Sequence, residues 1–403
     1  MKHVPSNLVG PPARGNDFYG RDQFVDLVWE KLGLGHVILA APRRFGQTSV
    51  MYRLIDAPRW DYRLVHCDLD HFTEPADLLT SLVVQFSQDD ALAGIASALS
   101  FVPSKVWKGF RDHVDEVEVH KLKIKLRESI RTNWQASGEE LFGAVAGAKQ
   151  TVVLILDEFA VMIDRMTRHP ESLEDAKTLL RWLRHLRQSP ETGNIRFLIT
   201  GSIEIGPVLQ RIGETASIDD CECLKLEPFS EKVADDFLYA LAAAHEVPLP
   251  VVVRARILQL IGTRVPYFLQ VMFSEIAKAF KQGGGAPTLA SVDKIYVEKV
   301  LGVDCKTYFD HYYGRLRDYY GPEDERTAKA ILRRLAEEVK VVHSSCYRIY
   351  QAHARGRDVD AFHGLMAYLE NDFYIGFDPK THEYEFSCKL LRDWWLRHYG
   401  MEV

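Results

Sequence analysis

Residues 41–49 combine a glycine, two arginines and two hydroxyl residues in one short segment, Ala-Pro-Arg-Arg-Phe-Gly-Gln-Thr-Ser. A phosphate-binding loop has the pattern G-x-x-x-x-G-K-[ST], which Gly46 and Thr48 match and from which Ala41 and Gln47 depart. In such a loop, backbone amides at a helix N-terminus bind phosphate oxygens, and the Thr48 hydroxyl would bind Mg²⁺. The segment therefore predicts a phosphate-binding loop, and the alternative is an ordinary strand-to-helix turn.

Gln47 occupies the position at which this loop pattern carries a lysine. A lysine would place a positive charge on the β and γ phosphates, whereas a glutamine amide donates only neutral hydrogen bonds. A charge-assisted hydrogen bond is worth about 1.5–3 kcal/mol, and a neutral one about 0.5–1.5 kcal/mol. We therefore expect nucleotide binding weakened about ten-fold or more, and hydrolysis reduced further because charge develops in the transition state. Arg43 or Arg44 would compensate in part.

A second candidate segment is the apolar run 151–156, which is followed directly by Asp157 and Glu158. A buried strand that ends in two carboxylates has the form of a Walker B motif. Asp157 would then hold the Mg²⁺ shell, and Glu158 would orient the attacking water. The alternative is that the two carboxylates cap the next helix.

Two further segments contain residues that would assist hydrolysis. The next apolar run ends in Thr200-Gly-Ser202, and in a parallel sheet this strand end also lies near the γ-phosphate. Thr200 or Ser202 is therefore a candidate sensor of that phosphate, and otherwise they begin a turn. Arg211, placed after the following helix, is a candidate arginine finger for a neighbouring subunit.

Predicted strands and helices, which must position these residues, alternate along the first half of the chain. Short apolar runs predict buried strands at residues 36–40, 62–68, 151–156, 195–200 and 221–226. Helical spacing predicts helices at residues 21–32, 48–55 and 173–187. This order predicts an α/β fold with a parallel sheet and helices on both faces. The mostly helical stretch near residues 75–147 exceeds a simple crossover and predicts a helical insertion.

The pattern changes after Pro228. Helices are predicted at residues 230–244, 251–261, 267–281 and 289–299, and later at 324–339, 344–353 and 358–370. A two-strand signal at 373–377 and 384–387 follows, which indicates a winged helix-turn-helix. We therefore predict a P-loop NTPase domain at 1–228, a helical lid at 229–318 and a winged-helix domain at 319–403. Trp394 and Trp395 are expected to pack inside the last domain.

The composition favours an ordinary globular protein of the cytoplasm. The chain of 403 residues is 47% hydrophobic and 26% charged, with a net charge of -6 that argues against a surface built for general nucleic-acid binding. Its six cysteines show no zinc spacing and are expected to be reduced thiols. No apolar stretch approaches the roughly 20 residues of a membrane span, so no membrane association is expected.

Five motifs in order make the chain similar to the archaeal-type ATPase group of the STAND/AAA+ P-loop ATPases. They are Phe18-Tyr19-Gly20-Arg21, the loop with Arg43, Arg44, Phe45, Gly46, Gln47, Thr48 and Ser49, the Leu156–Phe159 strand end, Thr200–Ser202, and Gly262 to Pro266 with the aromatics after it. The resemblance implies that the first motif packs near the adenine and that Pro266 lies over the base. It also implies a P-loop AAA+-type parallel sheet with helices on both faces. ATP and Mg²⁺ are the implied cofactors, with ATP and ADP driving a switch. Because Gln47 replaces the lysine of the family, we expect the rate of ATP hydrolysis to differ from that of the family, while the fold stays the same.

The partner of the predicted winged helix could be either DNA or a protein. From residue 321 to 403 there are 12 Lys and Arg against 14 Asp and Glu, and the recognition helix 358–370 begins and ends with acids. Acidic groups repel DNA phosphates, although Arg355 and Arg357 precede that helix. The main hypothesis is an ATP-responsive switch whose module contacts a protein or a second copy of the chain. The alternatives are a DNA-binding initiator or transposition regulator and a nucleotide-dead scaffold.

Overall fold

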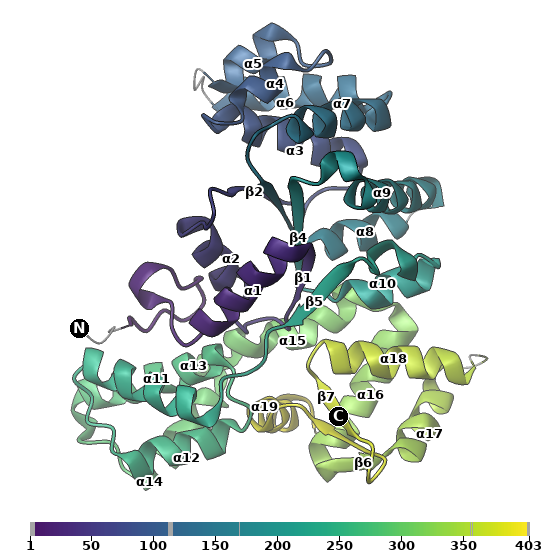
Figure 1. Cartoon of the computed structure of the whole chain (residues 1–403). Helices are drawn as coiled ribbons and strands as arrows, with labels where there is room; N and C mark the ends of the chain where they lie inside the picture. Colours follow the sequence, from purple (N-terminus) through teal and green to yellow (C-terminus); the bar gives the residue numbers. More distant parts are fainter. Residues whose placement is uncertain (1–4, 112–115, 169, 355, 357, 401–403) are drawn as a thin grey trace. The chain divides into compact units, whose positions relative to one another are not determined.

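The computed structural model describes residues 5–111, 116–168, 170–354, 356 and 358–400 (Figure 1). These residues form two compact units. The sheet unit comprises Gln23–Ala41 and Met51–Leu226, and the C-terminal unit comprises Met1–Asp22, Pro42–Val50 and Glu227–Val403. The phosphate-loop segment is therefore grouped with the second half of the chain. The finer division at residues 228 and 318 remains a prediction.

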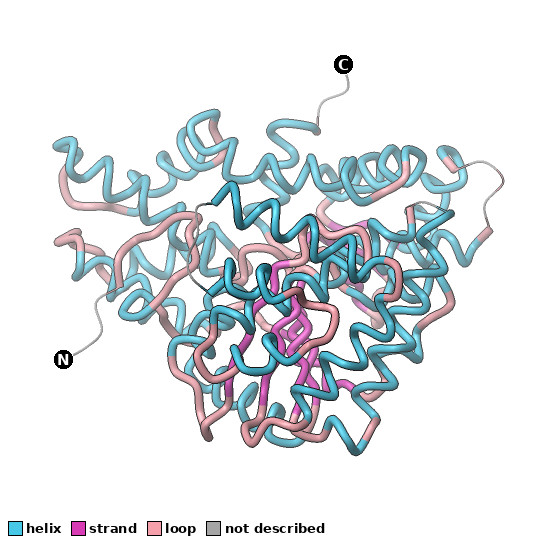
Figure 2. Tube along the Cα trace, turned by 90° about the horizontal axis from the view of Figure 1, so that it is seen from above, coloured by secondary structure: helices cyan, strands magenta, loops and turns pink. Residues whose placement is uncertain are grey.

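The sheet unit is built on five parallel strands, drawn in magenta in Figure 2. They are β1 (His36–Ala40), β2 (Arg63–Asp68), β3 (Val152–Asp157), β4 (Ile195–Gly201) and β5 (Cys221–Lys225). Their order is β2-β3-β4-β1-β5. β3 and β4 are almost entirely buried, which explains why both appear as continuous apolar runs in the sequence. The predicted α/β fold with a parallel sheet is confirmed.

Helices connect these strands and bury their apolar faces against the sheet. They are α1 (Asp22–Leu34), α2 (Gln47–Asp56), α8 (Phe159–Thr167), α9 (Pro170–Gln188) and α10 (Ile205–Ile212). α9 buries one leucine-rich stripe, as its helical spacing predicts. The helical stretch after β2 forms α3 (Pro75–Gln88), α4 (Ala93–Ala98), α5 (Ser104–Arg111), α6 (Glu116–Arg131) and α7 (Trp134–Ala146). Figure 1 shows these five helices gathered beyond β2.

The inserted helices share one apolar core with the sheet. Trp182 of α9 lies at this junction, where its ring makes edge contacts with Trp134 and Phe142 of α7 at 5.4 Å. A Cβ at Gly138 would lie 2.4 Å from that ring. Gly138 therefore permits the close approach of α7 to α9, because any larger residue would collide with the indole.

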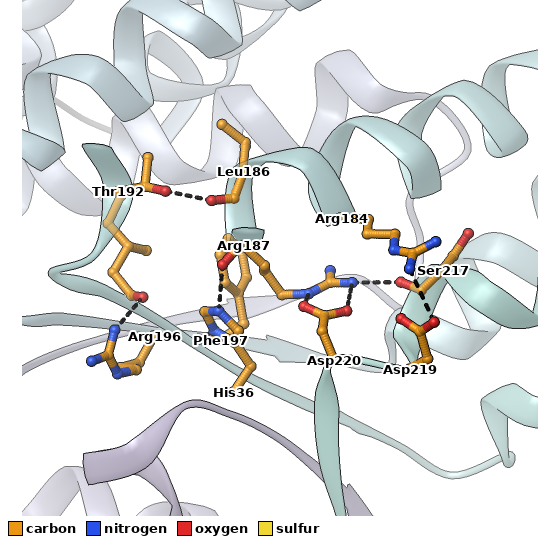
Figure 3. A network of polar contacts seen from close by, with 11 residues as sticks. His36, Arg184, Leu186, Arg187, Thr192, Arg196, Phe197, Ser217, Asp219 and Asp220 are labelled. Atoms are coloured by element: carbon orange, nitrogen blue, oxygen red, sulfur yellow. Dashed lines mark hydrogen bonds and ion pairs between the residues drawn. The ribbon is translucent and has the colours of Figure 1, made fainter. Parts of the chain in front are cut away.

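A polar network joins the end of α9 to the segment before β5 (Figure 3). The Arg187 guanidinium is 2% exposed and binds both carboxylate oxygens of Asp220, at 2.8 and 2.9 Å. Arg184 makes a single hydrogen bond to Asp219, from Nη2 to Oδ2 at 3.0 Å. A buried guanidinium needs such bidentate partners because an unpaired charge there would be costly. The network therefore fixes β5 against α9.

His36 at the start of β1 belongs to the same network (Figure 3). Its Nδ1 accepts a hydrogen bond from the Phe197 amide at 3.2 Å, so its Nε2 carries the proton and donates to the Arg187 carbonyl at 3.1 Å. Burial lowers the pKa of His36, and the positive charges of Arg187 and Arg196 lower it further. The ring is therefore neutral and structural in the folded protein.

We expect His36 to make the folded state sensitive to acid. An unfolded histidine has a pKa of about 6.5, so below that pH the unfolded chain binds a proton that the folded chain does not. The stabilisation is present above about pH 6.5 and is lost as the pH falls toward the lower folded pKa. Urea unfolding at pH 7.5 and 5.5 should show a smaller acid loss for His36→Gln than for the wild type. The exposed His353→Gln serves as the control, and equal acid losses in all three proteins would contradict this role.

After Glu227, the C-terminal unit contains helices close to the positions that the sequence predicts. They are α11 (Glu231–Ala244), α12 (Val251–Ile261), α13 (Pro266–Ala279), α14 (Leu289–Ile295) and α15 (Lys306–Tyr319), with π-helical turns at Phe280–Gly284 and Tyr296–Val300 and a 3₁₀ turn at Val303–Cys305. The helix expected over 289–299 is thus α14 continued by a π turn. α15 was not predicted, because its aromatic and charged residues show no simple apolar stripe.

The last part of the chain, here called the C-terminal module, spans residues 322–399. It contains α16 (Pro322–Glu338), β6 (Lys340–Val342), α17 (His343–His353), α18 (Val359–Asn371), β7 (Ile375–Asp378), β8 (Glu383–Phe386) and α19 (Lys389–Tyr399). The strands form an antiparallel sheet in the order β6-β8-β7, so the predicted hairpin gains a third strand. Trp394 and Trp395 are 0% exposed, which confirms that they pack in the interior.

Two global expectations can be compared with the structure. None of the helices in the described residues has both the length and the apolarity that a membrane crossing requires. The six cysteines are free thiols.

Candidate functional site

The carboxyl edge of the sheet gathers the candidate catalytic residues of the sheet unit. Asp157 at the end of β3 pairs in register with Asp68 of β2, and Ala40 at the end of β1 pairs with Gly201 of β4. Parallel strands end at one edge, so the carboxyl ends of β3 and β4, which pair in register, lie there together. Thr200 is one residue before Gly201 and is 2% exposed.

Asp157 is held by side chains from both neighbouring strands. The Thr200 hydroxyl donates to its Oδ1, and His66 Nε2 of β2 lies 3.5 Å from its Oδ2. Burial opposes ionisation of Asp157, but the interactions with His66 and Thr200 outweigh it and lower the pKa of the carboxyl. Asp157 is therefore a carboxylate at neutral pH, as a cation-binding residue must be.

Glu158 has the left-handed backbone conformation, with φ of 57°. Its Oε2 accepts hydrogen bonds from the Ser202 amide at 2.7 Å and the Ser202 hydroxyl at 2.9 Å. Glu158 stands at the N-cap of α8, yet its side chain makes no capping hydrogen bond. The carboxylate is therefore directed to the end of β4 and does not serve as a helix cap. A strained backbone that aims a carboxylate in this way is common at functional sites.

Arg211 lies inside the last turn of α10, not beyond that helix as expected. Its Nη2 binds Asp164 Oδ1 at 2.5 Å, and Arg168 Nη2 binds Asp164 Oδ2 at 2.7 Å. The Asp164 side chain is only 6% exposed, while the Arg211 side chain is 45% exposed. The arginine-finger role remains a prediction, and it would require the pair with Asp164 to open.

The segment predicted to bind phosphate turns sharply before α2. Arg44 and Gly46 both have positive φ, at 73° and 97°. α2 begins directly afterwards at Gln47, and the Val50 amide donates to the Gly46 carbonyl at 3.0 Å. Consecutive turns of this kind before a helix N-terminus direct backbone amides to one side, which suits an anion. A Cβ at Gly46 would meet no atom within 4 Å, so lack of space does not explain the glycine. Its positive φ does, because residues with a side chain rarely adopt that conformation.

The predicted adenine motif is joined to this loop within the C-terminal unit. The Arg21 guanidinium lies 4.6 Å from the centre of the Phe229 ring and donates to the Phe45 carbonyl at 3.3 Å. Burial lowers the pKa of Arg21 to about 10, which still leaves it charged. Gly20 has φ of 67°, and a Cβ there would lie 2.6 Å from Val233. The Tyr19 ring packs against the Phe237 ring of α11, with 5.1 Å between the ring centres.

Side chains of the loop also contact α13 and the C-terminal module. Phe45 is 2% exposed and meets Phe373, which follows α18, edge to face at 4.8 Å. The Arg44 guanidinium lies 4.5 Å from the Tyr267 ring centre, next to Pro266 at the start of α13. These contacts join Phe45 to Phe373 and Arg44 to Tyr267. Ser49 Oγ accepts a hydrogen bond from the Ala13 amide at 2.9 Å, which ties the N-terminal lead to α2.

Sequence reasoning missed two residues of this region. His66 contacts Asp157. The sequence feature that could have identified it is its position near the carboxyl end of a predicted strand, two residues before Asp68. Phe373 contacts the loop, and no sequence signal indicates this, since the contact joins residues more than 300 positions apart. Local patterns report periodicity and turns, whereas such a contact depends on the packing of separate elements.

The described residues do not form a metal site made of protein ligands alone, but they fit a magnesium ion that is also bound by phosphates. Within the described residues, no cluster of three or more His, Cys, Asp or Glu side chains could hold a metal ion. Mg²⁺ in nucleotide sites keeps several waters and takes one or two protein ligands besides the phosphates. The ionised carboxylate of Asp157 in the sheet unit is a ligand of that kind. The role of the Thr48 hydroxyl remains a prediction.

Comparison with known proteins identifies the fold. No family model matches the chain, and no curated protein matches it. Among solved structures it is similar to a Walker-type ATPase of Pyrococcus abyssi, at 14% identity over 96% of this chain and 99% of that chain, with a TM-score of 0.62. It is also similar to the ORC2 protein of Aeropyrum pernix in ADPNP–ADP complexes, at 13% identity over 96% and 93%, with a TM-score of 0.50. These likenesses show the fold: a parallel five-stranded α/β domain followed by helices.

Proposed function

We propose that this chain is an AAA+/STAND-type P-loop ATPase that binds ATP and Mg²⁺ and acts as a nucleotide-dependent switch. The observation that carries the proposal is the arrangement at the carboxyl edge of the sheet. There an ionised Asp157, a directed Glu158 and the buried Thr200 lie beside the end of β1. The chain leaves β1 into a loop with two positive-φ residues and then enters α2.

Each residue has a proposed role in that chemistry. The amides of residues 43–49 would bind the phosphates, and Thr48 and Asp157 would be the protein ligands of Mg²⁺, which would supply positive charge to the phosphates. Glu158 orients the attacking water, while its bonds to Ser202 hold the carboxylate in position. Thr200 responds to the γ-phosphate through its bond to Asp157. Gln47 brings no positive charge, so turnover is slow.

The C-terminal module is proposed to be the output of the switch. Its helices and three-stranded sheet suit a winged helix-turn-helix, and Phe373 links it to Phe45 of the loop. The exposed face of α18 carries Asp360 and Glu370. Because carboxylates repel DNA phosphates, we favour a protein partner or a second copy of the chain. Arg355 and Arg357, proposed for DNA contact, lie outside the described residues.

The test of the switch is the assembly and shape of the full chain with and without nucleotide. Small-angle scattering and crosslinking should change between no nucleotide, ADP with Mg²⁺ and saturating ATP with Mg²⁺. Calorimetry on the same samples measures nucleotide binding. Identical scattering and crosslinks despite bound ATP would refute the switch. No detectable binding of ATP would refute ATP recognition and favour a scaffold.

A further inference from the structure

A groove on the C-terminal unit lies among three helices that pack on one another. α12 contacts both α14 and α19, and side chains of all three helices and of the π turn after α14 line the groove. Its volume is about 480 Å³, which is comparable with the pockets that proteins use for binding. The described lining comes from residues 256–301 and 389–397. The groove is therefore separate from the phosphate-binding segment at residues 41–49.

The groove has an apolar floor that continues to the surface. Leu260, Tyr296 and Leu301 are at most 7% exposed, whereas Val297 is 51% exposed and Leu396 is 41% exposed. An apolar surface that extends from buried to exposed residues often marks a site for a partner. Covering it would release water from apolar surface, which favours binding.

The walls of the groove follow the helical repeat. Positions three, four and eight apart lie on one face of a helix, so each wall presents a stripe of side chains along the groove. The stripe of α19 extends from Lys389 to Arg397, about 12 Å at 1.5 Å per residue. Three such stripes around one groove resemble a helix bundle that lacks one member, and an amphipathic helix of about two turns would complete it. The stripes are Arg256 and Leu260 of α12; Asp293, Tyr296, Val297 and Leu301 of α14 and the residues after it; and Lys389, Asp393, Leu396 and Arg397 of α19.

Ion pairs hold the polar side chains of these walls in place. Arg256 binds both carboxylate oxygens of Asp293, at 2.7 and 3.2 Å. Asp393 accepts hydrogen bonds from the Tyr296 hydroxyl at 2.8 Å and from the Lys389 ammonium group. These contacts order the side chains before a partner arrives, so binding costs less conformational entropy.

The α19 side of the groove carries an excess of positive charge. Asp393 is shared by Lys389 and by Arg392, whose Nη2 lies 2.7 Å from it. Arg397 donates to the Val297 carbonyl, and in the part of the chain that the structure describes no carboxylate pairs with it. Two positive charges are thus not offset beside the apolar surface. Carboxylates of a partner would complement them, and a cationic partner would be repelled.

We propose that this groove binds an acidic amphipathic helix of a partner protein. Apolar side chains of that helix, one turn apart, cover Val297 and Leu396. Carboxylates beside them pair with Arg397 and with the Lys389 end of α19. The inference goes beyond the proposed function, because it requires neither bound ATP nor the exposed face of α18.

The experiment measures the binding of a synthetic peptide to the full chain by fluorescence anisotropy at low salt. The probe is an amphipathic peptide of about 15 residues, with leucines at positions i, i+4 and i+7 and glutamates beside them. A second peptide has lysine in place of every glutamate. The glutamate peptide should bind, and the lysine peptide should bind at least about ten-fold more weakly because like charges face one another.

Substitutions on and off the groove locate the bound peptide. Val297→Asp and Leu396→Asp should each weaken binding about ten-fold or more, because a carboxylate enters the apolar contact. Both residues are exposed, so the fold should be retained, which circular dichroism verifies. Arg397→Gln should weaken binding about two- to five-fold, the effect of one solvent-exposed ion pair. Val359→Asp, at a residue 44% exposed, and the exposed Arg348→Gln are the matched controls and should bind like the wild type.

The possible outcomes separate this proposal from its alternatives. No binding of the glutamate peptide to the wild type would overturn it, and so would equal binding by the wild type and the folded Val297→Asp and Leu396→Asp proteins. Equal binding of the two peptides would overturn the acidic character of the partner. Sedimentation showing self-association that Leu396→Asp abolishes would assign the groove to a second copy of the chain instead. Peptide binding lost in both aspartate variants supports the proposal whether or not the protein binds ATP.

Discussion

Replacing Gln47 with lysine should raise the affinity for ATP about ten-fold or more and raise the rate of hydrolysis by a larger factor. Gln47 is the first residue of α2 and directly follows Gly46, so a lysine there would leave the loop toward bound phosphates. A neutral amide is exchanged for a charged donor, and the gain is greatest in the transition state because charge develops there. Calorimetry with ATP and Mg²⁺, followed by phosphate-release assays, measures both effects.

A second substitution assigns the restored turnover to this site. In the Gln47→Lys background, Glu158→Gln should abolish hydrolysis while ATP still binds, because the amide cannot accept a proton from the attacking water. Its hydrogen bonds with Ser202 would be partly retained. The control is Gln135→Lys, which makes the same change of charge at an exposed position of α7. Equal ATP affinity in the wild type, Gln47→Lys and Gln135→Lys would contradict the role given to the loop.

Replacing Asp372 with asparagine should lower the free energy of unfolding by about 3–5 kcal/mol. Its carboxylate binds Arg315 at 2.9 Å and accepts a hydrogen bond from the Tyr320 hydroxyl at 3.1 Å. The two charged side chains are only 5% and 9% exposed. The substitution leaves a buried guanidinium without its counter-charge, and neutral amide bonds cannot replace it. Denaturant unfolding followed by tryptophan fluorescence measures the loss, because Trp394 and Trp395 are buried in the same module.

The neighbouring pair of Arg317 and Asp318 provides the matched control for this prediction. These groups lie 3.5 Å apart with side chains 75% and 56% exposed. Solvent screens such a pair, so Asp318→Asn should change the free energy of unfolding by no more than about 0.5 kcal/mol. If both asparagine variants lost the same small amount, burial of the Asp372 pair would not be the source of its stability.

The sequence was most informative where the signal is local. β1 and α12 begin and end at the predicted residues, and the other sheet strands differ by one or two residues. A buried parallel strand must be apolar on both faces, so its run of residues is visible without any knowledge of its neighbours. Gly46 was recognisable for a similar reason, because a tight turn before a helix needs its backbone freedom.

The elements that were missed are those without a local signal. β6 has three residues and exists because β8 supplies its hydrogen-bond partners. α15 mixes buried aromatics with charged residues, and its His311 and Arg315 acquire their environments from residues of α13, the loop and the turn after α18. The spacing of apolar residues along a helix does not reveal which distant charges surround one of its side chains.

The sequence by itself thus determined the α/β class, the order of the strands and helices, and the chemical types present at the strand ends, because each depends on neighbouring residues along the chain. Only the tertiary structure decided that His66 and Thr200 hold Asp157, that Ser202 holds Glu158, and that Asp164 holds Arg211. It also decided that Phe45 packs on Phe373 and that the buried Arg315 pairs with Asp372. These features depend on the distances between elements far apart in the chain, and distance and burial determine the strength of a charge or a hydrogen bond.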